Sequence, residues 1–210
     1  MASNIITQNI LKLAVLGLAL TGCCHRQTIC ILDPTLTSIN IIDRNGLTET
    51  INNPERLDQY SQVNFLQPQP YQKVLRVYSR DAQGNIPACI TSYHPNGYVM
   101  KYLEVMNSRA CGEYMEWYPN GVLKVSTNVI EGAADIALGS EKSWVFDGCS
   151  KAWADDETLE ANITYVKGSL EGISLYYHSN GNLWKSIPYV QNRVHGTVEI
   201  FLCDGTLLQT

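Results

Sequence analysis

A short pattern recurs along the second half of this 210-residue chain. It consists of a glycine, an aromatic residue five positions later, and Asn-Gly or Asp-Gly eight and nine positions later. The three clear copies span 112–121, 172–181 and 196–205. The closing glycines keep one register, because Gly205 follows Gly181 by 24 residues and Gly121 follows Gly97 by 24 residues. A fixed period of this length predicts an array of small repeated units.

Two further copies are incomplete. One has Ala88 where the first glycine is expected. The other runs from Gly148 to Glu157 and keeps Trp153 at the aromatic position. Its closing position lies 36 residues after that of the preceding copy, which is half a period too far, so we expect an insertion near 130–147.

The residues between the turn signals favour strands. Asn-Gly and Asp-Gly adopt the positive φ angles of tight hairpin turns at low cost. Runs such as 98–105 are aromatic and β-branched, partly alternating in polarity, and of strand length. A lone hairpin is marginal in water, so the units must pack together. The sequence therefore predicts an all-β fold over residues 71–210, an elongated antiparallel meander of β-hairpin repeats of about 24 residues.

This pattern resembles the MORN repeat variant (membrane occupation and recognition nexus) of bacterial proteins named as YwqK-type antitoxins. The resemblance covers roughly residues 73–210. The matching residues are Gly112, Trp117, Tyr118, Asn120 and Gly121, then Tyr165, Gly168, Gly172, Tyr176, Tyr177, Asn180 and Gly181, then Tyr189, His195, Gly196, Phe201, Asp204 and Gly205. The resemblance implies MORN-like β-repeats and, through the family name, neutralisation of a toxin by direct contact.

The N-terminus carries a separate signal. Residues 13–20 form an unbroken apolar run, which is too short to cross a bilayer of roughly 30 Å as a helix. The run ends in Leu20-Thr21-Gly22-Cys23, which resembles the lipobox of bacterial lipoproteins. The resemblance implies cleavage after residue 22 and lipid attachment to the Cys23 thiol. The alternative interpretation is a buried apolar helix that opens the domain.

Lipidation of Cys23 predicts a lipoprotein anchored to a membrane of the cell envelope, because no second long apolar stretch follows. Cys24 follows, and not the Asp that retains lipoproteins in the inner membrane, so the resemblance favours the outer membrane in a cell with two membranes. Pro and Asn punctuate residues 23–70, where we expect an irregular tether with a short strand over 38–42. The predicted organisation is a signal peptide at 1–22, a tether at 23–70 and a repeat domain at 71–210.

Composition limits the partners. With 17% charged residues, a net charge of −5 and no cluster of Lys or Arg, the chain has no footprint for nucleic acid. We expect the membrane, reached through the lipid, and a protein of unknown identity as partners. Six cysteines remain beside Cys23, and export allows disulfides among them. Small buried thiols are the open alternative.

No catalytic motif is present in the sequence: there is no Gly-x-Ser-x-Gly, no His-Glu-x-x-His and no phosphate loop. His94 and His178 each precede a repeat turn, and we interpret them as turn residues. The acidic run Asp155-Asp156-Glu157 lacks the ligand spacing of a calcium loop and is interpreted as a solvated turn. We therefore expect no enzyme activity, no cofactor and no metal site.

One aromatic residue recurs at the same offset of every unit, in the series Tyr93, Trp117, Trp153, Tyr177 and Phe201. We interpret this series as the core of the array, because stacked repeats must bury such a row. The alternative is a groove for a peptide or lipid. Strand side chains alternate sides, so the neighbouring offsets of Tyr118 and Tyr176 favour an exposed binding face. The binding candidates are Tyr118, Tyr176, Trp117 and Tyr177.

Three functions follow from these features. The leading hypothesis is a non-enzymatic binding or scaffolding lipoprotein of the envelope. The second, implied by the family resemblance, is an antitoxin or immunity-type protein that neutralises a toxin by direct binding. The third is an enzyme with a site in the repeat groove, for which the sequence offers no residues.

Overall fold

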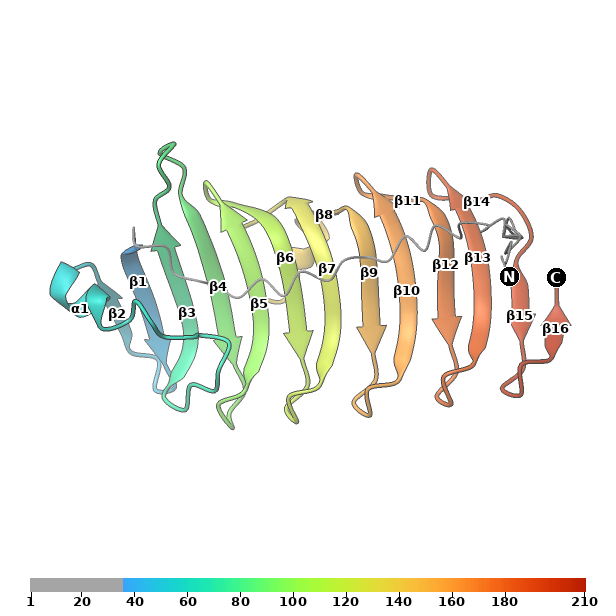
Figure 1. The fold of residues 1–210 in the computed structure, drawn as a ribbon, viewed down its shortest axis with the longest axis horizontal. Helices are drawn as coiled ribbons and strands as arrows, with labels where there is room; N and C mark the ends of the chain where they lie inside the picture. Colours follow the sequence, from blue (N-terminus) through green and yellow to red (C-terminus); the bar gives the residue numbers. More distant parts are fainter. Residues whose placement is uncertain (1–35) are drawn as a thin grey trace, which may run out of the picture.

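The computed structural model describes residues 36–210, and this part of the chain folds into one antiparallel sheet of 16 strands (Figure 1). The elements are β1 (Leu36–Asp43), β2 (Thr48–Ile51), α1 (Pro54–Asp58), β3 (Gln72–Ser79), β4 (Pro87–Tyr93), β5 (Val99–Met106), β6 (Arg109–Trp117), β7 (Leu123–Glu131), the 3₁₀ helix η1 (Ser140–Ser143), β8 (Val145–Phe146), β9 (Gly148–Trp153), β10 (Leu159–Val166), β11 (Ser169–Leu170), β12 (Gly172–Tyr177), β13 (Leu183–Val190), β14 (Arg193–Val194), β15 (Glu199–Phe201) and β16 (Leu207–Gln209). The predicted all-β meander is confirmed.

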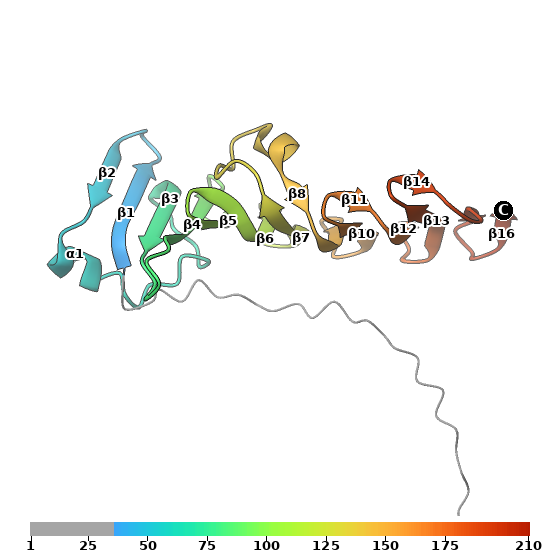
Figure 2. The ribbon, with the colours of Figure 1, turned by 90° about the horizontal axis from the view of Figure 1, so that it is seen from above.

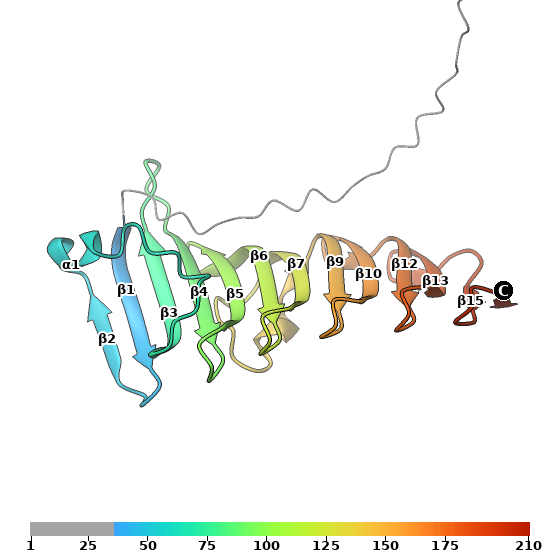
Figure 3. The same ribbon diagram turned by 60° about the horizontal axis from the view of Figure 1, so that its bottom comes forward.

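Most strands pair with their neighbours in the chain. The sheet runs in the order β16-β15-β13-β12-β10-β9-β7-β6-β5-β4-β3-β1-β2, while the short β8, β11 and β14 pair with β7, β10 and β13. Figures 2 and 3 show a long, narrow layer with α1 at one end and the C-terminus at the other. A single layer of this kind offers two faces, and each is covered over a different part of its length.

One type of turn joins the strands at their lower ends in Figure 1. At Tyr118 the backbone N–H donates to the carbonyl of Val122, and the N–H of Gly121 donates back to Tyr118. The incomplete copy makes the same two bonds at 154–158, although Glu157 holds the left-handed position at φ 71°. The repeat geometry therefore persists where the glycine signature has been lost.

The expected insertion is present as residues 132–147, which contain η1 and β8 and fold over the back face of the sheet (Figure 2). At its centre Trp144 packs on Tyr114 with ring centroids 4.7 Å apart, and its Nε1 donates to the carbonyl of Ala133 at 2.9 Å. The insertion completes a back-face core of Ile90, Leu103, Val105, Ala110, Tyr114, Val129, Ile136 and Trp144.

The N-terminal part of the described chain corrects the prediction of an irregular tether at 23–70. From residue 36 onward this segment belongs to the fold, because β1 pairs with β3 and β2 extends the sheet beyond β1. The chain then crosses the front face through α1, and Phe65 and Leu57 are buried with Ile39 of β1. The proline and asparagine residues mark turns between apolar side chains that reach the core. The expected strand at 38–42 is confirmed within β1.

The predicted signal peptide at 1–22, the lipidation site Cys23 and the remainder of the predicted tether at 24–35 lie outside the described residues. Between residues 36 and 210, no helix has the length and apolar character needed to span a bilayer.

The described cysteines fall into different environments. Cys89 is buried in the front core, and the Cys149 thiol donates to Oδ1 of Asn162 at 2.7 Å. Cys111 and Cys203 are exposed free thiols. Cys89 therefore fits the alternative of small buried thiols, whereas Cys111 and Cys203 do not.

Candidate binding surface

A row of cross-strand pairs runs along the front face, one pair in each repeat. Each pair joins the aromatic residue that ends one strand to the aliphatic residue that begins the next, and residues that face each other across a ladder lie on the same side of a sheet. We call these pairs the aromatic row: Tyr93–Val99, Trp117–Leu123, Trp153–Leu159, Tyr177–Leu183 and Phe201–Leu207. The aromatic series predicted from the sequence thus forms one continuous surface feature.

The row is buried at one end and exposed at the other. Tyr93 and Val99 are 4% and 6% exposed, whereas Leu207 is 48% exposed. The cause is the segment 54–70, which lies over the N-terminal end of the front face (Figures 1 and 2). Within residues 36–210, no second segment covers the row from Trp153 onward. The interpretation of the series as a buried core therefore holds at its first pair and fails toward the C-terminus.

Side chains of the lower turns couple each repeat to the next. The Nε2 atoms of His94 and His178 donate to the carbonyl of the aromatic residue in the following repeat, at 2.8 and 2.9 Å. Tyr118 occupies the same position and donates its hydroxyl to the carbonyl of Trp153 at 3.0 Å. Ala154 fills this position in the incomplete copy and has no such donor. The two histidines therefore act as turn residues that connect repeats.

A hollow of about 570 Å³ opens on the front face beyond the end of the covering segment. It is lined by Asn120, Gly121, Val122, Leu123, Lys151, Trp153 and Glu157. Lys151 lies beside Trp153 because alternate residues of β9 share a face. The hollow therefore combines an apolar wall from the aromatic row with one ammonium group.

The lower rim of the hollow is acidic. Asp155, Asp156 and Glu157 are all exposed in the turn between β9 and β10. Hydrogen bonds from the side chain and backbone of Thr158 hold the pKa of Asp156 below its usual range, so this carboxylate is ionised at neutral pH. The rim therefore favours a positively charged group on a bound molecule.

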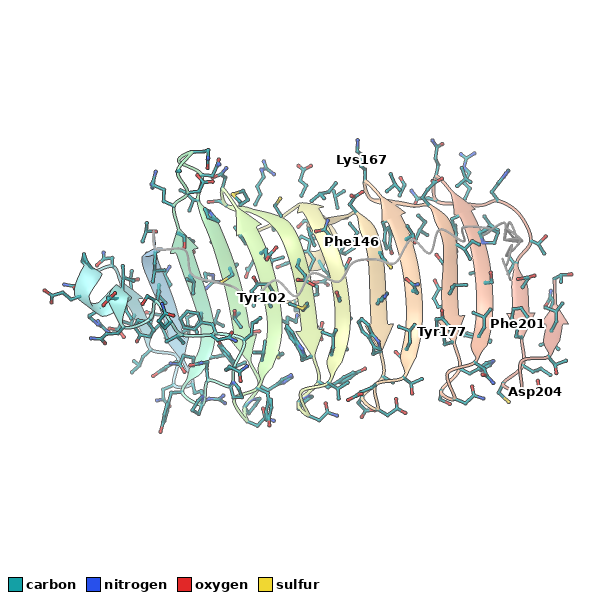
Figure 4. All side chains as sticks on the ribbon, viewed as in Figure 1. Tyr102, Phe146, Lys167, Tyr177, Phe201 and Asp204 are labelled. Atoms are coloured by element: carbon teal, nitrogen blue, oxygen red, sulfur yellow. The ribbon has the colours of Figure 1, made fainter. Side chains whose placement is uncertain are left out.

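Two polar groups of the row face the front without a hydrogen bond from residues 36–210. They are the indole Nε1 of Trp153 and the hydroxyl of Tyr177. Tyr177 is labelled in Figure 4, on the lower half of the sheet. Burial raises the pKa of Tyr177, so its hydroxyl keeps its proton at neutral pH and acts as a donor. Both groups are suited to a carbonyl oxygen of a bound chain.

The four binding residues predicted from the sequence do not form one patch. Trp117 and Tyr177 belong to the aromatic row, whereas Tyr176 lies on the back face, where it pairs with Ala161. Tyr118 serves the connection between repeats described above. Their binding role stays a prediction, and the structure separates them into two faces and a turn.

Sequence reasoning missed the aliphatic half of each pair. The signal was present, because an aliphatic residue follows each aromatic residue of the series by six positions, as Leu159 follows Trp153. It was overlooked because this offset spans the turn and matches neither helix nor strand periodicity. The face of Lys151 follows from its spacing of two residues from Trp153, but its neighbour across the ladder, Ser126, depends on the register between β7 and β9, which the sequence does not give.

A second hollow of about 380 Å³ lies on the back face, between the insertion and the sheet. Tyr114, Trp144 and Phe146 form its apolar wall. It occurs at one place in the array because only one insertion exists within the described residues. The aromatic row, in contrast, recurs in every repeat and continues beyond its cover.

Two hairpins match the sequence model of the family described as MORN repeat variant, over residues 110–130 and 170–191. Over these two stretches the chain is similar to the MORN repeat variant. Each match spans two strands and the lower turn between them, β6 with β7 and β12 with β13. MORN repeat domains are generally binding or scaffold modules. No curated protein and no solved structure matches the chain.

Proposed function

We propose that this protein is a membrane-anchored lipoprotein whose MORN repeat array acts as a non-enzymatic binding module of the cell envelope. The observation that carries the binding role is the uncovered aromatic row from Trp153 to Leu207. A single sheet layer that leaves such a row half-buried on one face offers a ready surface for a protein partner. The surrounding carboxylates and Lys151 would orient that partner.

The anchor is proposed from the lipobox that ends at Cys23. The sheet begins at Leu36, only 13 residues later, so the chain between them spans at most about 45 Å when fully extended. A tether of residues 23–70, as expected from the sequence, would have a longer maximum span. The array would therefore work close to the membrane surface.

The anchor is tested by Cys23→Ala, with Cys24→Ala as the matched control. We expect Cys23→Ala to abolish lipid attachment, seen as the loss of acyl mass at the N-terminus, and to release the protein from membranes. Cys24→Ala should keep both the lipid and the membrane fraction. Retention of the Cys23→Ala protein with an unmodified N-terminus would overturn the anchor.

The binding role is tested by crosslinking in intact cells, followed by purification of the protein from detergent-solubilised membranes. We expect a stoichiometric protein adduct that disappears when Leu159 and Leu183 are both replaced by Gln. Turnover of a substrate by the purified protein, with no adduct, would contradict the binding module.

The resemblance of the repeats to YwqK-type proteins supports a second candidate, an antitoxin or immunity-type protein. In that case the partner is a toxin, and the same uncovered surface neutralises it by direct contact. Deletion of the gene would then be lethal only in the presence of a neighbouring toxin gene. Survival of the deletion strain with an active toxin gene would remove this candidate and leave the first intact.

A further inference from the structure

The first repeat shows how the aromatic row takes up a polypeptide segment. Residues 54–70 lie on the first pair of the row, and their Phe65 is 2% exposed. The hydroxyl of Tyr93 donates to the carbonyl of Phe65 at 2.8 Å, and the N–H of Gln69 donates to the carbonyl of Gly97 at 2.9 Å. One donor from the row and one acceptor from the lower turn thus hold the backbone of the segment.

A basic side chain completes this contact. Arg44, in the turn after β1, donates to the carbonyl of Pro70 and, at 2.7 Å, to the carbonyl of His94. It therefore joins the segment to the lower turn of the first repeat. Apolar side chains of the segment meet the front core at about every third residue, namely Leu57, Tyr60, Val63 and Leu66, and Phe65 beside the last of them is also buried there.

The third and fourth pairs of the row offer the same surface without a cover. Trp153 and Tyr177 supply the donors that correspond to Tyr93, and neither is engaged within residues 36–210. The carbonyls of Glu157 and Gly181, which correspond to that of Gly97 in these two pairs, accept no backbone hydrogen bond from the described chain. The hollow beside Trp153 leaves room for apolar side chains.

The charge at this place differs from that in the first repeat. Glu157 lines the hollow, and Asp155 and Asp156 precede it in the same exposed turn. None of the three forms a salt bridge within the described residues. No arginine takes the place that Arg44 holds in the first repeat. A basic group that joins a bound segment to this turn must therefore come with the segment itself.

We propose that the front face over Trp153–Leu159 and Tyr177–Leu183 binds a segment of a partner protein built like residues 54–70. The segment presents aromatic or aliphatic side chains about every third residue and a backbone carbonyl to Trp153 or Tyr177. It places a Lys or Arg at the acidic turn 155–157. This inference rests on the proposed binding function and deepens it by naming the surface and the chemistry of the partner segment.

The test uses a synthetic peptide with the sequence of residues 54–71 and a Gln69→Lys change, added to the full-length protein in detergent. Gln69 is the residue of the segment that contacts the lower turn of the first repeat, so the lysine supplies the basic group that the proposal requires. The chain has four tryptophans. Peptide binding is followed by NMR through their indole N–H signals, and each signal is to be assigned with a single Trp→Phe variant. We expect the Trp153 signal to shift with saturation, while Trp144 under the insertion does not move. A peptide with Ser in place of Leu57 and Phe65 should cause no shift.

Two variants on one strand separate the faces of the sheet. Leu159→Gln changes the front face of β10, and Ile163→Gln changes its back face, since Ile163 pairs with Ser150 behind the sheet. We expect Leu159→Gln to weaken peptide binding roughly tenfold, the loss of about one buried aliphatic contact. Ile163→Gln should stay within a factor of two. Thermal melts of both proteins confirm that they are folded.

Several outcomes overturn the proposal. They are an unmoved Trp153 signal at millimolar peptide, equal weakening by both variants, and a shift confined to Trp144. Binding of lipid vesicles, or self-association of the protein, that Leu159→Gln abolishes while the peptide fails would assign the face to another occupant. An envelope partner that crosslinks through Ile163 would keep the proposed function and refute the front-face assignment. Peptide binding to the front face without any envelope partner would keep the front-face assignment and contradict the proposed function.

Discussion

Glu157 holds, at φ 71°, the backbone position that glycine holds in the other lower turns of the array. A non-glycine residue in this left-handed region costs about 1–2 kcal/mol, because its Cβ approaches the backbone carbonyl. Glycine removes this strain but adds unfolded-chain entropy of about 0.4–1 kcal/mol. We therefore expect Glu157→Gly to stabilise the protein by about 0.5–1 kcal/mol, or about 1–4 °C in melting temperature for a chain of this size.

The assay is urea unfolding followed by circular dichroism, with Glu157→Gln as the matched control. The control removes the same negative charge beside Asp155 and Asp156 and keeps the strained backbone. Its stability should stay within about 0.5 kcal/mol of the parent, as is usual for exposed charges. If Glu157→Gly were no more stable than Glu157→Gln, the strain argument would be wrong.

Three further perturbations test the contacts of the array. Tyr93→Phe removes the donor to the buried carbonyl of Phe65 and should lower the free energy of unfolding by about 1–3 kcal/mol; an unchanged urea midpoint would show that the bond contributes nothing. Gly112→Ala at φ +126° would place its Cβ 2.7 Å from the Cβ of Glu104, so we expect a loss of at least about 2 kcal/mol in thermal unfolding, and a stability equal to the parent would contradict the close approach. Maleimide labelling of the folded protein, mapped by mass spectrometry, should modify the exposed thiols, and protection before reduction would indicate disulfides instead. These thiols are Cys111 and Cys203.

The repeat array could be derived from the sequence because its signals are local. The Asn-Gly and Asp-Gly turns recur at a fixed spacing, and the displaced position of Glu157 was enough to place the insertion. Even the incomplete turn at 154–158 forms as its register requires, since backbone hydrogen bonds close it without the glycine.

The parts that could not be derived depend on contacts between distant residues. The segment 36–70 joins the sheet because β1 pairs with β3 and Phe65 reaches the front core, and no local pattern marks either contact. The side on which the insertion folds follows from the fit of Trp144 against Tyr114, which sequence spacing does not encode.

The binding surface was only half predictable for the same reason. The aromatic series was visible in the repeat, and the strand alternation of Tyr176 and Tyr177 correctly separates two faces. Which pairs are buried depends on where the covering segment ends. That boundary lies between Tyr93 and Trp153, and it follows from the path of residues 54–70 alone.

The central claim is that the uncovered aromatic row is the surface that binds the partner. It is tested most directly by placing a photo-crosslinking amino acid at Leu159 on the front face, or at Ile163 on the back face, of the lipid-anchored protein in living cells. We predict one discrete protein adduct from position 159 and none from position 163. An adduct from position 163 alone, or no adduct from either position, would contradict the claim.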